Sequence, residues 1–112
     1  MTIAEVRSAA AYWAERLRLN DWEITVQFAP TETMDSHESD GLAMWSAEHR
    51  TAVILLRRKQ DDLEQTIVHE LLHVALQGHV PQTASDTYDV AEERSINAIA
   101  DAMTGFHRCL PQ

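Results

Sequence analysis

The segment His69-Glu70-Leu71-Leu72-His73 carries the side chains best suited to chemistry. On an α-helix, residues four positions apart lie one turn apart on nearly the same face, so the imidazoles of His69 and His73 can point at one metal ion. Glu70 projects about 100° from His69 around the helix axis, beside such an ion. The spacing predicts two ligands of a zinc site, with Glu70 as the general base for a water that zinc has acidified.

A catalytic zinc needs a third protein ligand, and the sequence offers Glu93, Glu92 and His79. If the chain returns as an antiparallel helix, a carboxylate near its beginning can reach the histidine pair. Glu93 has Asn97 one turn later, which can orient a ligand. We therefore favour Glu93 and keep Glu92 as the alternate. His79 comes last, because a helix that continues to Gln77 directs it elsewhere.

The first thirty residues predict a helix followed by a strand. Thr2 and Glu5 have the spacing of a capping box, and apolar residues then recur at helical spacing as far as Leu17. Between Trp22 and Phe28, apolar and polar residues alternate, which is typical of a half-buried strand. Residues 31–40 are polar and acidic, so they predict a loop, in which a fourth strand could lie.

Two further strands and two further helices follow. Residues 42–48 and 51–56 predict the strands, and a helix is expected from Asp61, which forms a start signal with Glu64, to the stop at Gly78. The last helix is predicted by an apolar stripe of Ile96, Ile99 and Met103, on which Glu92 also lies. Gly105 is expected to end this helix.

The order of these elements predicts an α+β fold in a single domain, residues 1–112. We expect an N-terminal helix and a small, mostly antiparallel sheet of three or four strands. A central helix would then bind zinc, and a C-terminal helix would carry the third ligand.

The composition argues against several classes of protein. A formal net charge of −9 would repel a phosphate backbone, so nucleic acid is not expected as a partner. The single cysteine, Cys109, excludes an internal disulfide and a cysteine-based zinc cluster. No apolar run approaches the length of a membrane span or of a signal-peptide core, so no membrane partner and a cytoplasmic location are expected.

Residues 42–104 resemble the catalytic core of gluzincin-type zinc metallopeptidases, which carry the pattern HExxH...E. Minimal single-domain members and the ImmA/IrrE-like and ArdC-like domains of bacteria and phages belong to this group. The resemblance rests on the motif at 69–73, on Gly78-His79 after it, and on Glu92-Glu93 followed by Ile96-Asn97 and Ala100. In that family a downstream helical glutamate, with a polar residue four positions later, is the third ligand. The resemblance carries these roles over to Glu93 and Asn97.

The resemblance implies a zincin-like fold and a metallopeptidase that cleaves a peptide or protein substrate. Ala43-Met44-Trp45 is similar to the edge strand that holds an extended peptide in thermolysin-like enzymes, and is equally compatible with a plain core strand. Tyr88 and His79 are candidate donors to the oxyanion. The alternatives are a zinc-stabilised, non-catalytic protein-binding module and a metal-free interaction domain. The three other histidines have no partner spacing and are expected on the surface: His37, His49 and His107.

Overall fold

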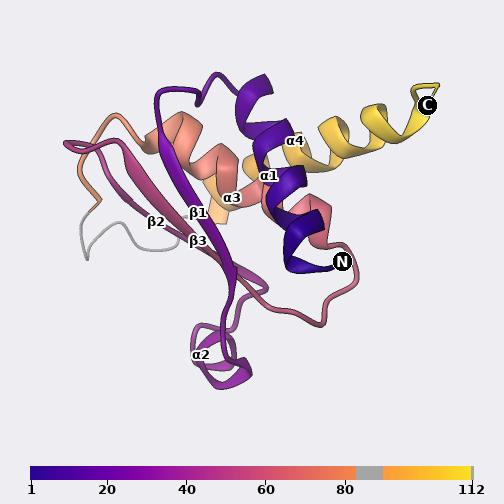
Figure 1. Ribbon diagram of the computed structural model, residues 1–112, viewed down its shortest axis with the longest axis horizontal. Coiled ribbons are helices and arrows are strands. Elements are labelled where there is room, and N and C mark those ends of the chain that lie inside the picture. The colour runs from indigo at the N-terminus through magenta and orange to yellow at the C-terminus, as the bar shows by residue number, and fades with distance from the viewer. Residues whose placement is uncertain (83–89, 112) are drawn as a thin grey trace.

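The computed structural model describes residues 1–82 and 90–111, and these form an α+β fold (Figure 1). The elements are α1 (Ile3–Arg16), β1 (Glu23–Phe28), α2 (Thr31–Ser36), β2 (Gly41–Ser46), β3 (Thr51–Leu56), α3 (Leu63–Gln77) and α4 (Val90–Cys109). The predicted α+β class is therefore confirmed. Figure 1 shows α1, α3 and α4 on the same side of the sheet.

Helix α1 begins at the predicted capping box. The Thr2 hydroxyl accepts the Glu5 N–H at 3.2 Å, and the Thr2 N–H donates to the Glu5 carboxylate at 2.9 Å. The buried face of the helix ends at Trp13, whose indole N–H donates to the Glu64 carboxylate of α3 at 3.1 Å. This hydrogen bond joins α1 to the helix that carries the histidine pair.

The sheet is mixed, which corrects the expectation of a mostly antiparallel one. Its order is β1-β3-β2, with β3 parallel to β1 and antiparallel to β2. The chain between β1 and β3 passes through α2 and β2, and this long connection allows a parallel pair. β3 takes the centre because its Ala52, Ile54 and Leu56 are all buried. β2 is consequently an edge strand.

Residues 31–36 form helix α2, so the prediction of a loop over 31–40 was wrong for that part. Within the described residues, this segment contributes no fourth strand. Its anchor is Met34, which is fully buried. One buried side chain in a six-residue helix produces no periodic pattern, and the polar composition around it therefore indicated a loop.

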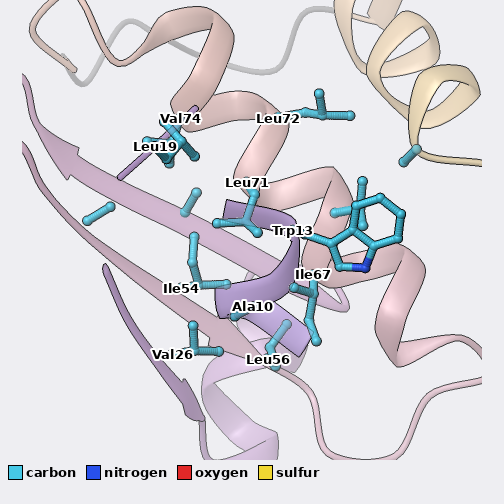
Figure 2. Packing of buried hydrophobic residues seen from close by; sticks show 14 of the residues in the cluster. Ala10, Trp13, Leu19, Val26, Ile54, Leu56, Ile67, Leu71, Leu72 and Val74 are labelled. Carbon is cyan, nitrogen blue, oxygen red and sulfur yellow. The ribbon is translucent and has the colours of Figure 1, made fainter. Parts of the chain in front are cut away.

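Helix α3 is the central helix, as predicted. Its N-cap is Asp62, one residue later than the predicted start signal at Asp61, and the Asp62 carboxylate accepts the Gln65 N–H at 3.1 Å. Figure 2 shows Ile67 and Leu71 of α3 packed with residues of β3 and α1. Because this apolar face is fixed against the sheet, the opposite face of α3 is held towards α4.

Helix α4 continues past Gly105, so the predicted stop there was wrong. An interior glycine costs a helix about 1 kcal/mol relative to alanine. Contacts beyond it offset this cost: His107 Nδ1 lies 3.1 Å from the Tyr12 hydroxyl, and Arg108 contacts Asp62 at 2.7 Å. His107 is therefore half-buried against α1, which corrects its expected place on the surface.

Candidate metal centre

The structure brings His69, His73 and Glu93 together. The Nε2 atom of His69 lies 2.9 Å from one oxygen of the Glu93 carboxylate, and Nε2 of His73 lies 2.7 Å from the other. Ligand atoms of the three side chains lie within 4.8 Å of one another, so the group could hold a metal ion. Two neutral nitrogens and one carboxylate are a donor set that first-row divalent metals accept.

Glu93 reaches the histidines because α3 and α4 run antiparallel. The buried residues of α4 are Ile96, Ala100 and Thr104, and Glu93 precedes Ile96 by three positions. It therefore continues the stripe that faces α3. The stripe predicted through Glu92 and Ile99 was wrong, since Ile99 is 42% exposed.

Glu92, the alternate ligand, contacts a different partner. The side-chain amide nitrogen of Gln77 donates a hydrogen bond to the Glu92 carboxylate, and the side-chain oxygen Oε1 of Gln77 lies 2.8 Å from Nδ1 of His73. Glu92 is therefore linked to His73 through Gln77. The sequence interpretation missed Gln77, although its position one turn after His73 on the same helix was a usable signal.

Both ring nitrogens of His73 face oxygen acceptors. Because the Gln77 amide nitrogen donates to Glu92, its oxygen must accept from Nδ1–H of His73, while Nε2 faces Glu93 at 2.7 Å. With Nδ1 engaged by Gln77, Nε2 is the ring nitrogen of His73 that faces Glu93. This orientation is compatible with a metal ligated through Nε2.

His69 is held in a form that can bind a metal. Burial lowers the pKa of His69; the Glu93 carboxylate opposes this effect, and the neighbouring His73 adds to it. Asn97, expected to orient a ligand, hydrogen-bonds to the Gln65 amide at 2.7 Å and also interacts with His69. The lowered pKa favours the neutral imidazole, which is the form that coordinates metals.

Glu70 is buried beside the histidine pair. Burial raises the pKa of Glu70 to about 7; the proximity of His73 lowers it, and the Glu93 carboxylate raises it further. Among the described residues, none donates a hydrogen bond to the Glu70 carboxylate. A carboxyl group with a pKa perturbed by burial, next to possible metal ligands, is a candidate for a functional role.

Gly41, at the start of β2, makes room for Glu70. A Cβ atom built on Gly41 would lie 3.0 Å from a carboxylate oxygen of Glu70 and 2.6 Å from Cγ2 of Thr66. Only glycine permits this approach without displacement of the strand or the carboxylate. The edge strand therefore passes directly beside the candidate base.

The remaining candidates lie apart from this group. His79 is exposed beyond the end of α3, which runs to Gln77 as expected, and it does not join the other three side chains. Tyr88 lies outside the described residues. His37 and His49 are exposed, as predicted, and His49 lies 3.0 Å from the Ser46 hydroxyl.

Comparison of the chain with protein-family models, curated proteins and solved structures found no match. Among the helices of the described residues, none combines the length and apolar character needed to cross a bilayer.

Proposed function

We propose that this protein is a zinc-dependent peptidase with a zincin-like arrangement, in which His69, His73 and Glu93 hold the metal. The observation that carries the proposal is the convergence of these three side chains, with the buried Glu70 carboxyl beside them. Two imidazoles and one carboxylate are a common protein ligand set for catalytic zinc, which keeps a fourth position for water or substrate.

Glu70 is the proposed general base. When bound, zinc polarises the scissile carbonyl and lowers the pKa of a water molecule. Glu70 accepts a proton from that water and later returns it to the leaving amine. Burial raises the pKa of this carboxyl to about 7 in the metal-free protein. A bound cation would lower this pKa and favour the ionised form, which is the form that accepts a proton.

The proposed substrate is an extended segment of a peptide or protein. In β2, alternate residues pair with β3, which leaves the main-chain groups of Ala43 and Trp45 on the open edge, whereas those of Gly41 are hydrogen-bonded to the Ser39 hydroxyl. Such an edge can accept an extended peptide as an added strand. Because Gly41 lies against Glu70, a peptide on this edge would pass beside the base.

Metal content by mass spectrometry tests the ligand assignment. Protein purified without chelators is expected to carry about one zinc per chain, by analogy with other three-ligand sites. Glu93→Ala should lose the metal, whereas Glu92→Ala and His79→Ala should retain it. Wild-type protein without metal would overturn the proposal, and loss of metal only in Glu92→Ala would reassign the third ligand.

Glu70→Gln tests the catalytic role. The amide fills nearly the same volume but cannot accept the proton, so hydrolysis of a peptide library should fall about 10²- to 10⁴-fold. Zinc content should stay at the wild-type level, because Glu70 is not a ligand. Undiminished hydrolysis in this variant would disprove the mechanism. Bound zinc without any turnover in the wild type would instead support the non-catalytic binding module.

A further inference from the structure

The side chain of Gln82 bridges two main-chain groups on the open edge of β2. The main-chain N–H of Trp45 donates to the side-chain oxygen Oε1 of Gln82 at 2.9 Å. The side-chain nitrogen Nε2 of Gln82 donates to the main-chain carbonyl of Ala43 at 3.1 Å. One carboxamide thus satisfies both a donor and an acceptor of the strand.

These are the groups that an added strand would need. The main-chain carbonyl of Asp40 accepts the Arg57 N–H at 2.8 Å. Since hydrogen-bonded residues alternate along an antiparallel strand, the main-chain groups of Leu42 and Met44 then bond to β3. Those of Ala43 and Trp45 point away from β3. The carboxamide of Gln82 carries one N–H donor and one C=O acceptor at this position, as a peptide strand would. It therefore occupies the place of part of a bound polypeptide.

A second contact and a tight turn place Gln82 on this edge. The Trp45 indole N–H donates to the Val80 carbonyl at 3.2 Å. At Gly78 the chain leaves α3 so closely that an added Cβ would lie 2.4 Å from the Val74 carbonyl oxygen and 2.8 Å from the Trp22 ring. Gln82 itself is exposed, so water competes for its hydrogen bonds and their net strength is small.

We propose that Gln82 is a displaceable plug of the β2 edge, which an extended polypeptide must release in order to dock beside the metal centre. This inference rests on the proposed function, because it assigns a regulatory contact to the same site. The polypeptide can bind only molecules in which the edge is open. Its apparent affinity is therefore the intrinsic affinity multiplied by the fraction of such molecules.

Amide hydrogen exchange measured by NMR tests whether the plug forms in solution. In Gln82→Ala, the Trp45 amide should exchange faster than in the wild type, while the Leu42 and Met44 amides, bonded to β3, should keep their rates. Gln27→Ala is the matched control, since Gln27 is an exposed glutamine on β1, at the opposite edge of the sheet. Equal Trp45 exchange rates in all three proteins would overturn the inference.

Peptide binding tests whether the plug competes with a ligand. The probe is a fluorescent pool of randomised ten-residue peptides, added to zinc-supplied Glu70→Gln protein so that no cleavage intervenes. Adding Gln82→Ala should tighten binding roughly three- to tenfold, the range expected when weak, exposed hydrogen bonds are released. Gln82→Glu should also tighten binding, because a carboxylate oxygen would then face the Ala43 carbonyl. Gln27→Ala should leave binding unchanged.

The outcomes separate this inference from the proposed peptidase. Tighter binding in Gln82→Ala without hydrolysis in any variant would support the plug and overturn the peptidase. Hydrolysis with the same KM in wild type and Gln82→Ala would leave the peptidase standing and overturn the plug. Self-association of Gln82→Ala without tighter peptide binding would also overturn it, because Gln82 would then only protect the edge against pairing between copies.

Discussion

At the scale of single residues, the most informative feature is the environment of His73. Each of its ring nitrogens faces an oxygen, one from Gln77 and one from Glu93. Gln77 is itself oriented by Glu92. A series of hydrogen bonds of this kind fixes the ring orientation and the tautomer of a metal ligand. It should therefore contribute to the affinity for the metal without contacting the metal.

Gln77→Ala should therefore weaken zinc binding about 10- to 100-fold while the protein still binds one equivalent, as is typical for partners of ligating histidines. Removal of the side chain leaves Nδ1 of His73 without its acceptor, and the ring can then rotate or change tautomer. Competition with a chromophoric chelator measures the affinity. Gln27→Ala provides the control, and an unchanged affinity in Gln77→Ala would show that the contact does not orient His73.

At the scale of elements, α3 is fixed at its beginning by Asp62. This carboxylate accepts the Gln65 N–H as the N-cap and contacts Arg108 of α4 at 2.7 Å. The hydrogen bond from Arg108 lowers the pKa of Asp62; burial opposes this effect, and the Gln65 N–H reinforces it. One side chain therefore couples the start of α3 to the end of α4.

Because the pKa of Asp62 is lower in the folded than in the unfolded protein, its contribution to stability is complete above the unfolded value. It is lost as the pH falls below 3.8 and through the folded value. Asp62→Asn should keep the cap and flatten this acid dependence of the free energy of unfolding. Asp62→Ala should in addition cost about 1 kcal/mol near neutral pH, through loss of the cap. Denaturant titrations over a pH series measure both, and an acid dependence in Asp62→Asn equal to the wild type would contradict the assignment.

At the scale of the whole molecule, polar contacts hold α4 near both of its ends. Near its beginning Glu93 joins the histidines of α3, and near its end His107 and Arg108 contact α1 and the start of α3. A metal ion bound by Glu93 and the two histidines would link α4 to α3 in the folded state only. Metal binding should therefore add directly to the stability of the fold.

Zinc at 100 times its dissociation constant should raise the free energy of unfolding by about 2.7 kcal/mol, and a chelator should reverse the effect. Thermal melts with and without zinc measure it as a shift in Tm. Glu93→Ala should abolish the shift, whereas His107→Ala should lower Tm in both conditions and keep the shift. A zinc-induced shift that persists in Glu93→Ala would place the metal elsewhere.

Local sequence determined much of this arrangement. The capping box at Thr2, strand 51–56 and the helix that carries His69 and His73 all follow from short-range patterns, because capping, alternation and helical periodicity involve residues that are close in the chain. The sequence also favoured Glu93 over Glu92 as the third ligand, through Asn97 one turn later, and left Glu92 as the alternate. These features need no knowledge of the remainder of the fold.

Only the tertiary structure decided the features that depend on distant partners. The parallel pairing of β1 with β3, the helical turn around Met34 and the continuation of α4 through Gly105 each depend on contacts with residues far away in the chain. The same holds for the space at Gly41 and for Gln82 on the edge of β2. Their free energy comes from packing and hydrogen bonds between segments, and a pattern along the sequence carries no record of which segments will meet.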